Sequence, residues 1–177
     1  MSVSFNALLG EGNVEQLIIR LGAQADHAID WAIWQTTEQT ILASGVLPDA
    51  AALETLQERA AGRPLTVLVP TTDVLLRTIT LPPGASRKVI QSIGFMLEDD
   101  VALDIDAQFI ALGPKQDNQQ AIAIVAHATM TTWLGWLNDA QLHCHRMLPD
   151  ILALPLAVPG DGGVSPLSNM QIREQFL

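Results

Sequence analysis

The residues of this chain with the clearest potential for chemistry are five carboxylates within nine positions. They are Glu98, Asp99, Asp100, Asp104 and Asp106, in the stretch SIGFMLEDDVALDID at residues 92–106. Carboxylates this close together could hold a divalent metal ion, act as a pair of catalytic acids, or form an acidic surface that binds another protein. The stretch therefore raises three different functions.

The spacing of these carboxylates argues against a metal site and against catalysis. A divalent cation needs oxygens that converge on one point, whereas Glu98, Asp99 and Asp100 fan out around a helix because successive residues turn by about 100°. A catalytic pair needs a pocket that shifts the pKa of its members, and no sequence motif indicates one. A solvated acidic face and a protein-docking surface both remain open.

A second group of reactive side chains is His143, Cys144 and His145. In a strand the two histidines point the same way and could bind a metal ion together with His127. Two histidines without a nearby third ligand motif are weak evidence, so an edge strand with polar side chains in water is favoured. Cys144 points away from both histidines, which favours a small packed residue over a nucleophile.

The composition limits the class of partner. The chain has 177 residues, of which 49% are hydrophobic and 16% charged, so it should fold around a real core. A net charge of -10 argues against nucleic acid and anionic lipid as partners, and favours a basic protein. One cysteine fits a reducing compartment. Neither a signal peptide nor an apolar run of about 18 to 20 residues is visible, so we expect a soluble cytoplasmic piece.

Hydrophobic periodicity predicts a mixed α/β domain. Strands are predicted over 15–22, 27–35, 39–47, 65–70, 72–82, 107–114, 119–128 and 143–149, and helices over 49–62, 86–103 and 130–140. The run 65–69 is almost continuously apolar and is predicted to be a central strand buried on both faces. Trp133 and Leu137 are predicted to face the core, and Trp34 and Trp136 are candidates for an exposed hydrophobic contact.

Several segments together resemble the cytoplasmic domain of the type II secretion system protein L family. They are LIIRLG, IDWAIW, ILASGVLPDAAAL, VLVPTTDVLLRTITLP, FMLEDDVALDID and RMLPDILALP, in that order along the chain. None of these segments would be specific alone, but their order and spacing form a fairly specific signature. The resemblance covers residues 15 to about 156.

The resemblance implies an actin-like (RNase H-like) α/β fold, with a mixed sheet and flanking helices. It implies a scaffold on the cytoplasmic side of the bacterial inner membrane that recruits the secretion ATPase, protein E of the system. It also implies pairing with the small membrane protein M in the full-length protein, and a homodimer is left open. We expect no catalytic residue, no cofactor and no metal ion, and contact with the membrane only through a helix absent here.

The resemblance also implies that the chain is a piece of a longer protein. Family members continue with more cytoplasmic domain, one membrane-spanning helix and a periplasmic domain. We expect residues 1–14 to be a flexible leader and 15–156 to be one or more actin-like subdomains. Residues 157–177 are expected to be a linker, PGDGGVSPLSN, followed by the start of a further, truncated subdomain.

An actin-like nucleotide-binding protein of pilus or secretion assembly is the alternative function. Enzymes of this fold grip phosphate with a glycine-containing hairpin that starts with an aspartate near the end of the first strand. In IIRLGAQADHAI, Arg20 and Leu21 precede Gly22 instead, and a Walker-type loop is absent from the sequence. Nucleotide hydrolysis is therefore not expected.

The predicted helix 86–103 supplies a docking hypothesis. Its outward face carries Arg87, Lys88 and Gln91 in the first half and Glu98, Asp99 and Asp100 in the second. This order opposes the helix dipole, which disfavours anions near the C-terminus by roughly 0.3 to 1 kcal/mol per exposed charge. We therefore expect an external use for this acidic face, together with Asp104 and Asp106 in the following loop: it binds a basic patch on the secretion ATPase.

Overall fold

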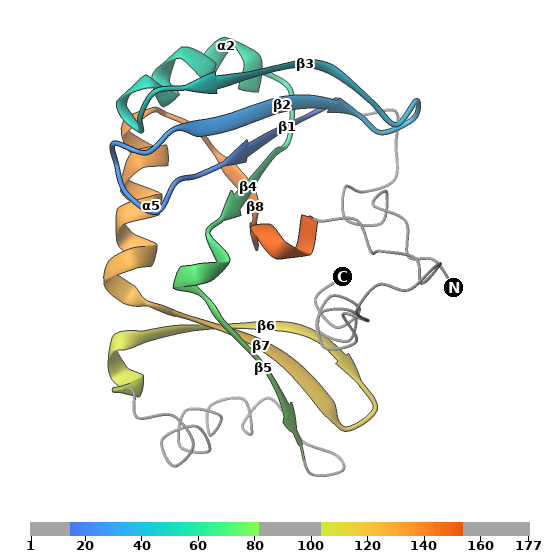
Figure 1. Ribbon diagram of the computed structural model, residues 1–177. Coiled ribbons are helices and arrows are strands. Elements are labelled where there is room, and N and C mark those ends of the chain that lie inside the picture. The colour runs from blue at the N-terminus through green and yellow to red at the C-terminus, as the bar shows by residue number, and fades with distance from the viewer. Residues whose placement is uncertain (1–14, 82–103, 154–177) are drawn as a thin grey trace, which may run out of the picture. The chain divides into compact units, whose positions relative to one another are not determined.

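The computed structural model describes residues 15–81 and 104–153 (Figure 1). The chain divides into two compact units. Among the described residues, the first unit comprises 15–73 and 131–153, and the second comprises 74–81 and 104–130. The leader 1–14, the helix predicted over 86–103 and the segment 157–177 fall outside the described residues.

The first unit is built on a five-stranded mixed sheet in the order β3-β2-β1-β4-β8 (Figure 1). The strands are β1 (Glu15–Arg20), β2 (Ile29–Gln35), β3 (Thr40–Leu47), β4 (Leu65–Val69) and β8 (Cys144–Pro149). The first three strands pair antiparallel, whereas β4 runs parallel to both β1 and β8. The prediction of a mixed sheet with 65–69 in its interior is therefore confirmed.

The composition of each strand explains its place in the sheet. In β4, Leu65, Val67 and Val69 are buried on one face and Thr66 on the other, as expected for a strand flanked on both sides. The edge strand β3 instead exposes Ile41, Leu42 and Val46. A β-bulge opposite Ile33 and Trp34 of β2 interrupts its pairing.

The helix predicted over 49–62 is present, but most of it is a 3-10 helix and not an α-helix. It begins as a 3-10 helix, η1 (Ala51–Leu56), and only its last turn, α2 (Gln57–Ala60), is α-helical. In a 3-10 helix, residues three apart share a face, and Ala50, Leu53 and Leu56 are all buried. The Asp49 carboxylate accepts a hydrogen bond from the backbone N–H of Ala52 at 3.0 Å, which satisfies one of the donors left unpaired at the start of the helix.

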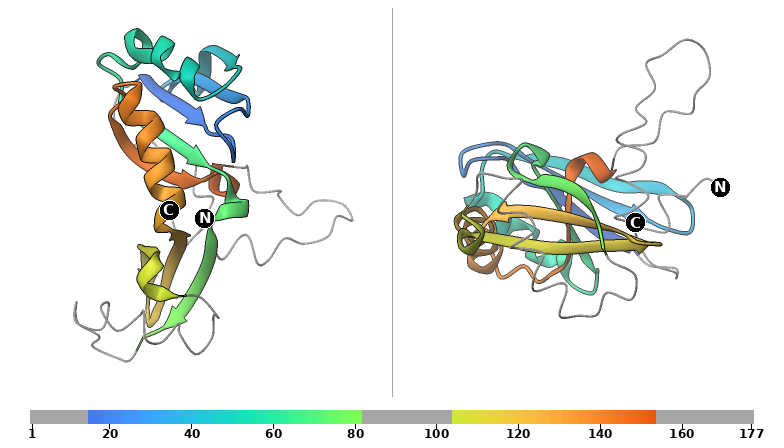
Figure 2. Two further views of the ribbon diagram at one scale, coloured as in Figure 1. Left: turned by 90° about the vertical axis from the view of Figure 1, so that its left-hand side faces the viewer. Right: turned by 90° about the horizontal axis from the view of Figure 1, so that it is seen from below.

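The long helix of the described residues is α5 (His127–Asp139), which crosses the sheet of the first unit (Figure 2). Trp133 and Leu137 are 1% and 2% exposed, so the predicted core face is confirmed. The helix begins at His127, which the sequence had placed in a strand. The polar run from His127 to Thr132 carries too few apolar side chains at alternate positions to extend the sheet.

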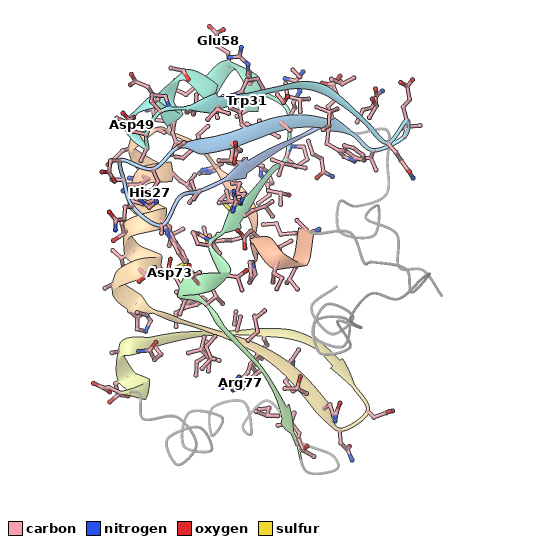
Figure 3. The ribbon with its side chains drawn as sticks, viewed as in Figure 1. His27, Trp31, Asp49, Glu58, Asp73 and Arg77 are labelled. Atoms are coloured by element: carbon pink, nitrogen blue, oxygen red, sulfur yellow. The ribbon has the colours of Figure 1, made fainter. Side chains whose placement is uncertain are left out.

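Trp31 of β2 lies beneath α2 (Figure 3). The guanidinium carbon of Arg59 sits 4.8 Å from the centre of its ring. On the neighbouring strand, a Cβ placed on Gly45 would lie 2.9 Å from the indole nitrogen of Trp31. Gly45 therefore leaves the space that lets this tryptophan lie flat across β3, and Arg59 covers it from the other side.

The second unit holds a three-stranded antiparallel sheet in the order β5-β7-β6. Its strands are β5 (Leu75–Thr80), β6 (Gln108–Gln116) and β7 (Gln119–Ala126). Ile122 and Ile124 form its core, against which Leu75, Ile79 and Ile110 pack. The strands predicted over 107–114 and 119–128 are confirmed as β6 and β7. The strand predicted to begin at 72 begins instead at Leu75, after a 3-10 turn, η2 (Thr71–Asp73).

Two further 3-10 turns lie next to strand ends, η3 (Ile105–Ala107) before β6 and η4 (Asp150–Ala153) after β8.

Within residues 15–81 and 104–153, every helix is too short or too polar to cross a membrane.

Candidate functional site

The acidic docking face lies mostly outside the part of the chain that the structure describes. This holds for Arg87, Lys88, Gln91, Glu98, Asp99 and Asp100. Asp104 and Asp106 are described, and both are exposed. The Asp104 carboxylate accepts a hydrogen bond from the backbone N–H of Asp106 at 3.2 Å, so it also shapes the turn that leads into β6. The docking face as a whole stays a prediction.

The described residues bring a different polar group together, at the C-terminal ends of the parallel strands β1, β4 and β8. Arg20 ends β1, Thr71 follows β4 by two residues, and Asp150 follows β8 directly. The carboxyl ends of parallel strands meet at one edge of a sheet, which is where α/β proteins commonly place functional groups. We call Arg20, Thr71 and Asp150 the strand-end cluster.

Asp150 is the centre of the strand-end cluster. Its Oδ1 accepts hydrogen bonds from the backbone N–H and the hydroxyl of Thr71, at 3.1 and 2.6 Å. Its Oδ2 accepts from the Arg20 guanidinium, at 3.1 Å from both Nε and Nη2. The Thr71 hydroxyl oxygen in turn accepts from the backbone N–H of Ile151 at 3.1 Å. The cluster therefore ties the ends of three strands together.

The environment of Asp150 favours its ionised form. Burial raises the pKa of this carboxyl, but the hydrogen bonds from the side chain and backbone of Thr71, and then Arg20, outweigh burial, so the pKa is lowered. The Asp150 side chain is 21% exposed. The second ion pair of Arg20, with Asp30 on the neighbouring strand, spans 3.4 Å between side chains that are both 56% exposed. The pair with Asp150 is thus the stronger one.

This geometry is that of a structural tie. Both Asp150 oxygens are occupied by donors within the protein, which leaves little capacity to hold a metal ion or to take a proton from a substrate. Across residues 15–81 and 104–153, three or more histidine, cysteine or acidic side chains nowhere converge as a metal site would require. Arg20 thus places a cation at the end of the first strand.

His145 and Cys144 of β8 have local partners. The Nδ1 atom of His145 accepts a hydrogen bond from the backbone N–H of Leu65 at 3.1 Å, beside the bulge between β4 and β8. Cys144 is half-buried, and burial raises the pKa of its thiol although backbone groups of Arg146 and Val67 offset part of this effect. A raised pKa disfavours the reactive thiolate, in agreement with a packing role.

The tryptophans proposed as exposed contacts are only half-buried, both Trp34 and Trp136. The large apolar side chains that are exposed lie elsewhere: Ile41, Leu42, Val46, Phe109, Leu112 and Leu134. Five of these lie on the edge strands β3 and β6: Ile41, Leu42, Val46, Phe109 and Leu112. The spacing of the tryptophans alone does not reveal which side chains an edge strand exposes.

The sequence analysis did not predict the strand-end cluster, although the sequence contains a pattern that indicates it. The segments VPTTD and LPD each place a polar residue directly after a predicted strand. Thr71 and Asp150 are 79 residues apart, and only the parallel pairing of β4 and β8 brings them together. Polar residues that follow two parallel strands are therefore the pattern to search for.

Comparisons with protein families and with known sequences point to one and the same family over most of the chain. A family profile described as type II secretion system, protein L, matches residues 17–175. The protein L sequence of Dickeya chrysanthemi is 34% identical over 161 residues, which cover 89% of this chain and 39% of that protein. The Vibrio cholerae protein L sequence is 30% identical over 169 residues, which cover 94% and 40%. The chain thus spans about two fifths of the length of these relatives.

Solved structures with the same fold include the cytoplasmic domain of EpsL, an inner-membrane component of the Vibrio cholerae type II secretion system. It superposes with a TM-score of 0.70 at 30% sequence identity, over 80% of this chain and 59% of that one. A PilM–PilN type IV pilus biogenesis complex gives a TM-score of 0.61 at 17% identity, over 80% and 49%, which is a likeness of fold alone. The predicted actin-like fold is confirmed.

Proposed function

The chain belongs to the type II secretion system protein L family, and from this premise we propose that it is a cytoplasmic scaffold of the inner-membrane platform that recruits the secretion ATPase. The observation that carries the proposal is the match to the EpsL cytoplasmic domain at 30% identity and a TM-score of 0.70. Protein L takes part in protein secretion. The role of holding the ATPase on the cytoplasmic side of the membrane is the specific step that we propose.

The charge of the chain supports a basic protein as its partner. With a net charge of -10, electrostatic attraction speeds encounter with a basic surface and disfavours acidic competitors. The PilM–PilN complex is an instance of this fold in an assembly with a second protein. We propose that the full-length protein also pairs with the membrane protein M of the same machine.

The acidic docking face gives this proposal its first test. Replacing Glu98, Asp99 and Asp100 by serine should slow association with the ATPase by roughly three- to tenfold at low salt, because exposed interface charges act mainly on the encounter rate. The dependence of the association rate on salt should become flatter. Surface plasmon resonance with immobilised ATPase, over a range of salt concentrations, measures both quantities.

The matched control removes three acidic charges elsewhere, with the changes Glu38→Ser, Glu58→Ser and Asp73→Ser. All three side chains are exposed. Because both variants lose three acidic charges, the control has the same net charge as the docking variant. It should associate at close to the wild-type rate. Equal slowing of both variants would show that only net charge matters, and an unchanged rate in the docking variant would make the face merely solvated.

The strand-end cluster supports a scaffold over a nucleotide-hydrolysing protein. The Arg20 guanidinium and the Asp150 carboxylate are bound to each other, so the end of β1 offers no free aspartate for a magnesium–phosphate complex. We expect titration calorimetry with ATP and Mg²⁺ to give no binding heat above dilution. Micromolar affinity would replace the scaffold proposal with that of an actin-like nucleotide-binding assembly protein.

A further inference from the structure

A cavity of about 410 Å³ lies in the first unit, beside the C-terminal end of α5. Three segments form its walls: the loop between β1 and β2, the beginning of η1, and the last turn of α5 with the residue after it. Four alanines, Ala25, Ala50, Ala51 and Ala140, supply the apolar lining. The volume falls within the range of roughly 300 to 1,000 Å³ that is usual for ligand sites.

Hydrogen bonds join the walls of the cavity to one another. The backbone N–H of Ala50 donates to the carbonyl of Ala25 at 2.8 Å, which holds the loop against η1. The side-chain amide of Gln57 donates to the carbonyl of Ala140 at 3.0 Å, which holds α2 against the end of α5. The shape of the cavity is therefore set before a ligand arrives, so little ordering is needed on binding.

The remaining lining residues are Glu54, Trp136 and Asp139. Both carboxylates are exposed and the indole is half-buried. The ion pairs of the described residues are made by Arg20 and Arg63, and neither carboxylate of the cavity takes part in them. A cation is attracted both by the carboxylates and by the face of an indole ring, and the lining contains no basic side chain to compete.

The position of Asp139 on its helix adds a separate argument. It lies in the last turn of α5, which carries no basic residue. The unpaired carbonyls of a helix C-terminus make that end partly negative, so a carboxylate there is unfavourable and a cation is favoured. The helix end, the two carboxylates and the indole of Trp136 that lines the cavity thus all favour positive charge at the same place.

We propose that this cavity binds the guanidinium group of an arginine presented by a basic partner protein. A guanidinium is planar, stacks on an aromatic ring, and donates in a fork that can reach two carboxylates, which suits the lining better than the compact ammonium of lysine. The inference rests on the proposed function only in taking the secretion ATPase as that partner.

The first experiment tests the cavity without any partner. Nitrogen-15-labelled protein is titrated with N-acetyl-arginine methylamide, and with its neutral citrulline analogue, while the tryptophan indole signals are followed by NMR. The Trp136 signal, assigned by its loss in a Trp136→Phe variant, should shift saturably with the arginine compound alone. The shift should disappear in a Glu54→Gln/Asp139→Asn double variant. No shift, or an equal shift with citrulline or in that double variant, would overturn the inference.

A matched control has the changes Glu38→Gln and Glu58→Gln, which remove two exposed carboxylates outside the cavity. Glu58 points outward from α2, away from the sheet (Figure 3). This control should keep the wild-type titration.

The second experiment measures affinity for the secretion ATPase. The cavity double variant should raise Kd by roughly five- to tenfold and the control should not, because a centrally placed arginine is typically an energetic anchor of an interface. Equal Kd values for both variants and wild type would overturn the docking of an arginine at this cavity. Failure of the wild-type protein to bind the ATPase would instead refute the proposed function, and the NMR titration alone would then decide the cavity.

Discussion

Replacing Trp133 by alanine is expected to lower the free energy of unfolding by about 3 to 5 kcal/mol, the usual cost of removing a large aromatic side chain from a core. Trp133 is 1% exposed, and it is the largest fully buried side chain among the described residues. It lies one helical turn from Leu137, which is 2% exposed. Trp133 is buried in a unit built on a five-stranded sheet, so the space that its side chain leaves should close only in part.

The measurement is urea unfolding followed by far-ultraviolet circular dichroism, with amide hydrogen exchange of β4 as a report on the first unit. The matched control is Trp136→Ala, three residues along the same helix and half-buried. This control should lose only about 1 kcal/mol, because much of its surface is already in water. A similar loss in both variants would contradict the assignment of one tryptophan to the core and the other to a cavity wall.

The two tryptophans also show how far sequence alone could lead. Helical spacing placed Trp133 and Leu137 on one face, and continuous apolar character placed 65–69 inside the sheet, because burial acts directly on the periodicity of side chains. The same periodicity could not distinguish the 3-10 form of η1 from an α-helix, since Leu53 and Leu56 share a face in both. It also could not reveal what surrounds a half-buried residue such as Trp136.

Candidate sites were harder to predict than elements, because they depend on long-range pairing. Glu54 and Asp139 come together only because the end of α5 packs against η1 and α2, through the contact of Gln57 with Ala140. Neither carboxylate lies in a charge run, so local composition gave no signal for them. Of the five carboxylates that composition did single out, the three at 98–100 fall outside the described residues. Carboxylates that are close together in the sequence are therefore not the same ones that come together in space.

Asp150 shows the same dependence on pairing, and its replacement by asparagine should have the second large effect. The change is expected to lower the free energy of unfolding by about 1.5 to 3 kcal/mol, the range for losing hydrogen bonds to a charged group. The carboxylate holds Thr71 through two hydrogen bonds and Arg20 through its guanidinium. An asparagine of the same size keeps one acceptor but presents an N–H₂ group to one of these donors.

Asp30→Asn is the control, because this carboxylate meets the same guanidinium at 3.4 Å but is 56% exposed. Exposed ion pairs contribute little, so the control should lose no more than about 0.5 kcal/mol. Urea unfolding at pH 7 of both variants and wild type provides the comparison. Equal losses would mean that Arg20, rather than the carboxylate between the strand ends, organises the cluster.

Acid titration distinguishes the stabilisation that comes from the ionised carboxylate of Asp150 from the stabilisation that comes from its packing. The pKa of this carboxyl is lower in the folded protein than its ordinary value near 3.8, so the unfolded chain takes up the proton first. The stabilisation is therefore complete above about pH 4 and is lost as the pH falls below that value through the folded pKa. The difference in unfolding free energy between wild type and Asp150→Asn should be constant from pH 7 to pH 5 and should shrink towards pH 3. A difference that stays constant down to pH 3 would show that packing, and not the ionised carboxylate, ties the three strand ends together.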